Sequence, residues 1–125
     1  MLLDSSAFIA FLNPADKHNS DATQRISGAQ TIEIHEVSVA ESLVRASAHE
    51  VVPHVLFVLE GLEATIVNSS GVGGAVRVAA IRHSMGLPLP DCYVIDAARE
   101  LGEPVLSFDA KLNKAAQDMG LSTVV

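Results

Sequence analysis

The chain has 125 residues, of which 49% are apolar and 18% are charged, and its formal net charge is −7. This size and composition predict one folded domain over residues 1–125 and exclude an intrinsically disordered chain. The acidic balance argues against nucleic-acid binding through a broad basic face, although it allows acids gathered around a divalent metal ion.

The compartment is predicted from features that the sequence lacks. No apolar run is long enough to span a membrane, and the start has neither the basic flank nor the small-residue cleavage site of a signal peptide. The single cysteine, Cys92, excludes an internal disulfide and fits a reducing environment. We therefore expect a cytoplasmic protein that does not associate with a membrane.

The first half of the chain alternates between strand and helix signals. In chain order it predicts a strand over 1–4, helices over 5–12 and 16–26, a strand over 31–38, and helices over 39–50 and 52–62. Asn13 and Pro14 break the first helix, and Gly28 ends the second. Ser38 is placed to cap the third helix, and Pro53 fits the first turn of the fourth.

The second half continues this alternation. It predicts a strand over 64–68, a loop and helix over 69–86, a helix over 91–101, a strand over 104–109, a helix over 110–120 and a last strand over 122–125. Apolar strands that alternate with helices predict an α/β fold with a mostly parallel sheet, buried on both faces. In such sheets, ligands bind outside the carboxyl ends of the strands.

Acidic residues fall at or beside that edge of the predicted sheet. One ends the first strand, one follows the second strand, one opens the helix over 91–101, and one ends the strand over 104–109. Carboxylates that meet at one edge repel each other unless their pKa values rise or a cation lies between them. Hard oxygen ligands of this kind suit Mg²⁺ or Mn²⁺. The acids are Asp4, Glu41, Asp91 and Asp109.

Helix capping is the alternative explanation for these acids. Aspartate is a common N-cap, and Asp4, Asp91 and Asp109 each stand at a predicted helix start. Ser38 and Glu41 have the spacing of a capping box. Capping does not require an acid at every start, however, because Ser, Thr and Asn serve as well. Held by such acids, divalent ions can activate a water and hold a phosphodiester without any nucleophilic side chain.

A family resemblance is carried by "LLDSSAFIAFL" (2–12), "VSVAESL" (37–43) and "LPLPDCYVIDAARELGEPVLSFDAKL" (87–112). Their order and spacing resemble the PIN domain family, and within it the VapC-like ribonuclease toxins of toxin–antitoxin modules. The resemblance covers essentially the whole chain. It implies a PIN-like three-layer α/β/α fold with a mostly parallel central sheet.

The resemblance also implies an activity and its site. The activity is metal-dependent cleavage of single-stranded RNA by an endoribonuclease that uses Mg²⁺ or Mn²⁺, and the partners are a second copy in a homodimer and a cognate antitoxin. Ser6 would hydrogen-bond Asp4 or a bound water, and Ser107 would support the site where the family more often has threonine. The resemblance assigns metal binding and catalysis to Asp4, Glu41, Asp91 and Asp109.

Several further residues are interpreted from their positions. Asp96 follows Asp91 on the same predicted helix, about 140° away around its axis. It is therefore either an outer metal ligand or an exposed or capping carboxylate. His35 is expected on the solvent face of its strand, and His18 is expected to pack or cap. Aromatic residues make up only 4% of the chain, so no stacking platform for bases is evident.

Two other functions remain open at this point. A receiver-like phosphotransfer domain also places acids at strand ends and binds Mg²⁺, but it needs a central phosphoacceptor aspartate and a lysine at the end of a late strand. Here Lys111 follows Asp109 by two residues. A non-catalytic binding module with the PIN fold would use the acids only as caps. The apolar segment 8–12 either packs in the core or leaves a groove for an antitoxin helix.

Overall fold

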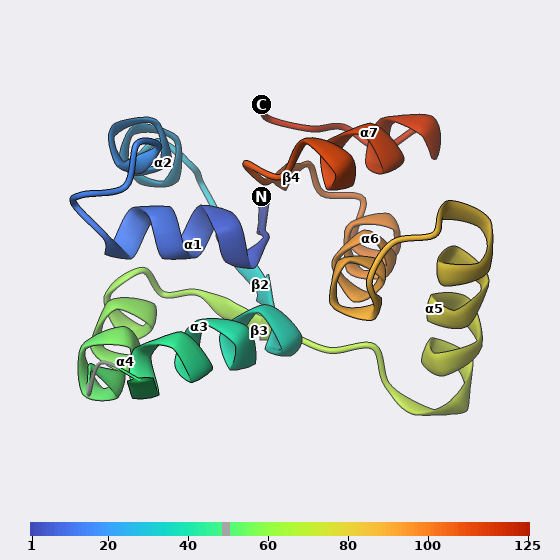
Figure 1. Ribbon diagram of the computed structural model, residues 1–125, viewed down its shortest axis with the longest axis horizontal. Coiled ribbons are helices and arrows are strands. Elements are labelled where there is room, and N and C mark those ends of the chain that lie inside the picture. The colour runs from blue at the N-terminus through green and yellow to red at the C-terminus, as the bar shows by residue number, and fades with distance from the viewer. Residues whose placement is uncertain (49–50) are drawn as a thin grey trace.

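The computed structural model describes residues 1–48 and 51–125. Within them, a four-stranded sheet in which every pairing is parallel lies at the centre of the molecule (Figure 1). The strand order is β3-β2-β1-β4. The strands are β1 Leu2–Leu3, β2 Glu33–His35, β3 Thr65–Val67 and β4 Val105–Leu106. The predicted α/β class with a mostly parallel sheet is confirmed.

Helices cover the sheet on two sides. Figure 1 shows α1 to α4 on one side of the strands and α5 to α7 on the other, which makes three layers. Helices α5 and α6 pack against each other, as do α1 and α2, and α3 contacts both α1 and α4. The helices are α1 Ser5–Leu12, α2 Asn19–Ser27, α3 Glu36–Ala48, α4 Val52–Gly61, α5 Gly71–Met85, α6 Leu89–Leu101 and α7 Ala110–Asp118.

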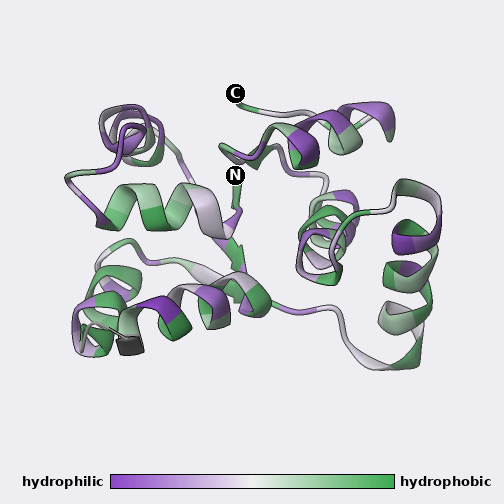
Figure 2. Cartoon of the chain, in the orientation of Figure 1, coloured by the Kyte–Doolittle hydropathy of each residue, from purple (hydrophilic) through white to green (hydrophobic). Residues whose placement is uncertain are grey.

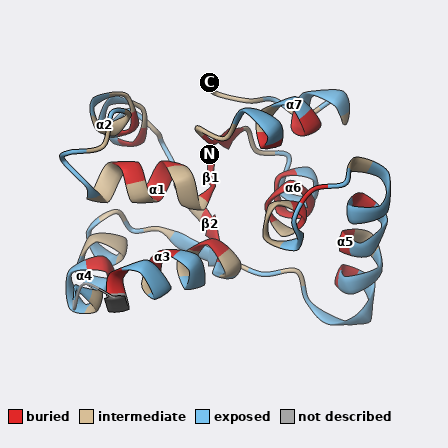
Figure 3. Ribbon diagram, in the orientation of Figure 1, coloured by how far each residue is buried: buried red, intermediate tan, exposed pale blue. Residues whose placement is uncertain are grey.

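The two faces of the sheet bury different side chains. Leu3 and Ile34 belong to a core cluster with Phe8 of α1, whereas Leu2 and Val105 pack with residues of α6 and α7. Neighbouring residues of a strand point to opposite faces, so β1 contributes to both layers. Figure 2 shows apolar residues along α1, and Figure 3 shows buried residues along α6. Burial on both faces accounts for the apolar strands of the sequence.

The strand order reverses beside β1. The chain passes from β1 to β2 and then to β3 on one edge, but β4 pairs with the other edge of β1. Open α/β sheets bind ligands at such a reversal, outside the carboxyl ends of the strands. Asp4 and Ser107 are the first residues beyond β1 and β4. The topology therefore places both of them at the expected binding edge.

The region around β2 differs from its prediction. β2 ends at His35 and α3 begins at Glu36, so the strand is shorter and the helix starts earlier than expected. His35 is only 1% exposed, and its Nδ1 accepts a hydrogen bond of 3.0 Å from the backbone N–H of Val37. The expected solvent-facing position of His35 is therefore wrong. The expected cap at Ser38 is also wrong, because this residue lies inside α3 and the His35 ring satisfies a first-turn donor instead.

The C-terminal segment forms less sheet than predicted. Residues 122–125 contribute a single bridge, from Thr123 to Val105, in place of the predicted strand. The end of the predicted helix over 39–50, at residues 49 and 50, lies outside the described residues. Among the helices that the structure describes, none combines the length and the hydropathy that a membrane crossing requires.

Candidate active site

Asp4 is held in place by hydrogen bonds at the carboxyl end of β1. Its side chain caps α1, where Oδ1 accepts from the backbone N–H of Ser5 at 2.7 Å and Oδ2 accepts from that of Ser6 at 3.4 Å. The Ser6 hydroxyl donates to Oδ2 at 2.7 Å, and the Ser107 hydroxyl donates to the same atom at 2.8 Å. Asp4 is buried. Because its oxygens accept so many bonds, the carboxylate has a fixed orientation.

The loop after β4 brings a second acid to this edge. The backbone N–H of Asp109 donates to the Ser107 hydroxyl at 3.0 Å, and Asn113 donates through Nδ2 to the Ser107 carbonyl at 2.9 Å. The Asp109 side chain caps α7 by accepting from the backbone of Lys111 at 2.9 Å. Ser107 thus links the caps of two helices, α1 and α7.

The other two acids come from helices rather than strand ends. Glu41 lies in the second turn of α3, and Asp91 lies in the first turn of α6. Neither of them caps a helix, since α3 begins at Glu36 and the N-cap of α6 is Pro88. The capping alternative therefore accounts for the backbone contacts of Asp4 and Asp109 but not for the bond from Ser107 to Asp4 or for the positions of Glu41 and Asp91.

These acids line one cavity of about 380 Å³. Its walls come from segments that are far apart in the sequence: the start of α1, the segment before α2, α3, the start of α6 and the loop after β4. The acidic side chains in the wall are Asp4, Asp16, Glu41, Asp91 and Asp109. The four carboxylates predicted for the site thus line the same cavity.

The acids in the cavity affect each other's proton affinity. Burial raises the pKa of Asp91 from 3.8 to about 6, and the negative charges of Asp4, Asp109 and Glu41 contribute to this rise. Partial burial and the charge of Asp4 also raise the pKa of Glu41, against the opposing effect of the neighbouring Ser5 side chain. This mutual repulsion means that a cation in the cavity would be strongly favoured.

The donor set fits a hard divalent ion in chemistry and in number. Mg²⁺ and Mn²⁺ prefer carboxylate oxygens, and the cavity presents several of them with little basic charge nearby. In the described ranges, however, no three acidic, histidine or cysteine side chains are already gathered as a ligand group. The carboxylates surround the space without converging on one point.

Asp96 does not line this cavity. It is 1% exposed, and its Oδ1 accepts from Nε of Arg77 at 2.9 Å while its Oδ2 accepts from the Ser69 hydroxyl at 2.9 Å. His35 joins the same group, with Nε2 lying 3.3 Å from the Ser69 hydroxyl oxygen. The group connects the end of β2 to α5 and α6. Asp96 is therefore part of an ion-paired network beside α5, away from the acid cavity.

The cavity also contains residues that sequence reasoning did not assign to it. Arg45 lies one turn after Glu41 on α3, a spacing that could have indicated it. His18 and Phe108 line the cavity as well, and their rings are stacked with centroids 4.3 Å apart and planes 2° apart. The low aromatic content of the chain gave no indication of this stack. These two residues are far apart in the sequence, so no local pattern reveals the pair.

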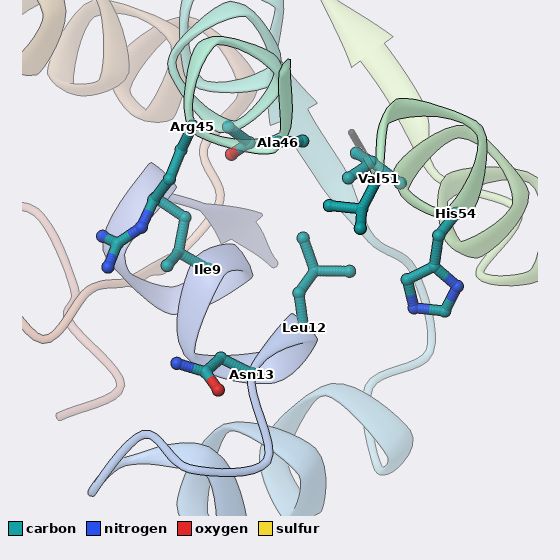
Figure 4. Close-up of a pocket in the computed structure, with 9 residues that line it drawn as sticks. Ile9, Leu12, Asn13, Arg45, Ala46, Val51 and His54 are labelled. Atoms are coloured by element: carbon teal, nitrogen blue, oxygen red, sulfur yellow. The ribbon is translucent and has the colours of Figure 1, made fainter. Parts of the chain in front are cut away.

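A mostly apolar groove adjoins the acid cavity. It has a volume of about 380 Å³ and lies between α1, the α3 helix and the start of α4. Figure 4 shows Leu12 and Val51 pointing into it from opposite sides, with His54 at one end and Arg45 at the other. Ile9 and Arg45 line both the groove and the acid cavity. The two spaces therefore share a wall.

Solved structures with the same fold have been found by comparison. A toxin-antitoxin complex from Klebsiella pneumoniae contains a chain with a TM-score of 0.75 and 20% identity, covering 90% of this chain and 88% of that one. VapC20 from Mycobacterium tuberculosis, a Sarcin-Ricin loop cleaving toxin, has a TM-score of 0.76 and 11% identity, covering 98% and 97%. FitAcB from Neisseria gonorrhoeae has a TM-score of 0.67 and 16% identity, covering 98% and 94%.

Sequence comparison gives the family. No curated protein matches the chain. The sequence profile of the PIN domain, in contrast, matches residues 1–118, which include every strand and helix described above. Its match extends over the strand ends and helices that form the acid cavity. The protein belongs to the PIN domain family.

Proposed function

We propose that this protein is a metal-dependent endoribonuclease that hydrolyses phosphodiester bonds of RNA with Mg²⁺ or Mn²⁺. The observation that carries the proposal is the common cavity of Asp4, Glu41, Asp91 and Asp109. Members of the PIN domain family are generally nucleases, and the similar VapC20 is a toxin that cleaves the Sarcin-Ricin loop. A receiver-like phosphotransfer domain has no support in this family match.

The acids would hold the metal through their carboxylate oxygens, directly or through water. When bound, divalent ions supply an activated water and stabilise the charge that develops on the phosphodiester. Asp4 offers a carboxylate that Ser6 and Ser107 already orient, so these serines are positioning residues. Glu41 and Asp91 have raised pKa values and no capping role, and one of them would take the proton of the attacking water.

Arg45 is the basic side chain in the wall of the cavity. It is exposed, and among the described residues it forms no ion pair. A guanidinium beside acids can bind a phosphate of the incoming RNA, because its planar donors match phosphate oxygens. This would partly offset the repulsion between RNA and an acidic site.

We further propose that the protein is the toxin of a toxin–antitoxin pair in the cytoplasm. The support is the likeness to the Klebsiella toxin-antitoxin complex and to the toxin VapC20, together with the apolar groove beside the cavity. An amphipathic antitoxin helix could place its apolar face in this groove. Because Ile9 and Arg45 belong to both spaces, a segment bound there would lie at the mouth of the acid cavity.

A homodimer is also part of the proposal. Val72 and Val76 are 81% and 63% exposed and lie one turn apart on α5. They form an apolar strip that a second copy could cover. Sedimentation of the wild type and of a Val72→Lys, Val76→Lys variant would test this, since the variant should sediment as a monomer if α5 is the contact.

The decisive experiment uses protein freed of any antitoxin. A mixed RNA pool with Mn²⁺ should be cut at internal positions by the wild type, and EDTA or Asp4→Asn should stop the cleavage. Asp118→Asn is the matched control, since this exposed carboxylate pairs with Lys114 away from the cavity. Cleavage that persists with EDTA or in Asp4→Asn would refute the mechanism. A protein that neither binds Mn²⁺ nor cuts RNA would instead be a non-catalytic binding module.

A further inference from the structure

The acid cavity has an aromatic side. The rings of His18 and Phe108 are stacked face to face, with centroids 4.3 Å apart and planes only 2° from parallel. Both residues line the cavity together with the acids, and both are partly exposed. Two parallel rings in the wall of a cavity are a feature that a planar group can extend by stacking.

Helix capping does not explain the position of the His18 ring. His18 is the N-cap residue of α2, but its side chain makes no capping hydrogen bond. The nearby turn is closed by Asp16, whose Oδ1 accepts from the backbone N–H of His18 at 2.8 Å. Within the described part of the chain, the imidazole nitrogens form no hydrogen bond. The stack with Phe108 is thus the specific contact of this ring.

Phe108 is fixed relative to the acids by its backbone. Its N–H donates to the Ser6 hydroxyl at 3.0 Å, and this hydroxyl donates to Oδ2 of Asp4 at 2.7 Å. The residues on either side of Phe108 are Ser107, which also binds Asp4, and Asp109, which lines the cavity. The same hydrogen bonds that orient Asp4 therefore set the position of the platform beside it.

We propose that the His18–Phe108 pair is a stacking platform for one unpaired RNA base next to the phosphodiester that is cut. This inference rests on the proposed ribonuclease function. Aromatic side chains bind single strands by stacking, and every base has a face that can stack. A base continues the stack of the two rings only if it is free of its own helix. The platform therefore favours unpaired RNA over duplex, and it does not by itself select a sequence.

The test combines a protein change with a change in the substrate. The substrate is a single-stranded oligoribonucleotide whose cleavage position has been mapped, with copies that carry one abasic ribonucleotide on either side of that position. The protein variants are His18→Leu, which keeps bulk without an aromatic face, and His18→Phe, which restores one. His83→Leu is the matched control, because this exposed histidine lies on α5 outside the cavity.

The expected result is that the protein change and the substrate change each lower kcat/KM, but that combining them lowers it no further. An abasic residue at one flanking position lowers kcat/KM of the wild type on the order of tenfold, the usual effect of losing one stacked base. His18→Leu causes a similar loss on the intact oligonucleotide and no further loss on the abasic one. His18→Phe recovers most of the activity, and His83→Leu equals the wild type. Losses that multiply, or a His18→Leu variant with wild-type activity, overturn the platform.

Failure of the platform is separable from failure of the proposed function. A wild type that does not cut RNA with Mn²⁺ contradicts the ribonuclease itself, whereas normal cutting by His18→Leu contradicts only the platform. Fluorescence anisotropy with the same labelled oligonucleotides, with Ca²⁺ in place of Mn²⁺, gives a readout that needs no cleavage. The wild type should bind the intact strand more tightly than one abasic copy, and equal or absent binding overturns the proposal. Phe108→Leu should repeat the pattern of His18→Leu.

Discussion

The Ser107 hydroxyl donates a hydrogen bond of 2.8 Å to Oδ2 of Asp4 and thereby joins the ends of two adjacent strands, β4 and β1. Ser107 is fully buried, and its oxygen also accepts from the backbone N–H of Asp109. One hydroxyl group therefore sets the distance between two acids of the cavity. This relationship makes Ser107 the most informative position for testing how the site is held together.

Replacing Ser107 with alanine should weaken both the fold and the proposed metal site. Asp4 would lose a hydrogen bond to its buried charge, which costs about 1.5–3 kcal/mol of the free energy of unfolding. We also expect Mn²⁺ affinity to fall on the order of tenfold, as for other partners of metal ligands. Urea unfolding and Mn²⁺ titration calorimetry measure the two effects.

Two controls accompany this variant. Ser107→Thr keeps the hydroxyl and should retain most of the stability and affinity. Ser122→Ala removes an exposed hydroxyl and should change neither. If Ser107→Ala unfolds at the same urea concentration as the wild type, the bond to Asp4 does not contribute to stability.

Asp91 should make the stability of the metal-free protein depend on pH. Its pKa is raised from 3.8 to about 6 in the fold, so the folded protein favours the protonated acid. The folded protein holds this proton more tightly than the unfolded chain does, which favours the folded state while the acid is protonated. This contribution to the free energy of unfolding is fully present below about pH 4 and is lost as the pH rises through about 6. Asp91→Asn removes the effect. The difference in unfolding free energy between variant and wild type should thus grow in favour of the variant from pH 4 to pH 7 and then level off.

This comparison is made by urea unfolding of both proteins in EDTA at several pH values. Taking the difference between the two proteins cancels the titration of groups that do not interact with Asp91. Asp118→Asn should show no such trend, because this carboxylate is exposed and lies outside the cavity. A constant difference between Asp91→Asn and wild type across this pH range would contradict the raised pKa.

Divalent ions should stabilise the wild type through the acid cavity. A ligand that binds only the folded state adds about 2.7 kcal/mol when present at a hundred times its Kd. We expect Mn²⁺ and Mg²⁺ to raise Tm at neutral pH, and Asp4→Asn to remove most of this increase. Differential scanning fluorimetry with a metal series provides the measurement. An equal rise in Tm for wild type and Asp4→Asn would place the bound ion elsewhere.

Asp96 should prove structural and not a metal ligand. Asp96→Asn loses the ion pair with Arg77, whose guanidinium is partly exposed, so the loss of stability should be at most about 3 kcal/mol, the lower end for a buried pair. The Mn²⁺ affinity of the folded variant should equal that of the wild type. A large drop in this affinity would instead return Asp96 to the role of an outer ligand.

The sequence predicted the positions of the acids better than their surroundings. Asp4 and Asp109 could be located because each follows an apolar strand, and parallel strands end at one edge of a sheet. Glu41 was placed at this edge by the predicted strand over 31–38, but β2 ends at His35 and Glu41 lies in the second turn of α3. Local patterns thus identify which residues approach the edge, while the distances between them depend on packing.

Features that depend on pairs of distant residues were not predicted. The His18–Phe108 stack joins the segment before α2 to the loop after β4, and nothing in either segment indicates the other. His35 was expected to face solvent because charged residues surround it, but its ring caps α3 through Val37 and lies near Ser69. In each case a tertiary contact decided the conformation over the local preference.

The wall shared by the groove and the acid cavity has a thermodynamic consequence. Ile9 and Arg45 line both the groove and the acid cavity, so a change in the conformation of either side chain alters both spaces at once. A molecule in one space that repositions these side chains changes the affinity of the other space for its own occupant, and by reciprocity the second occupant affects the first by the same factor. Communication between the two spaces would then need no change of fold, only a change in the conformations of two side chains.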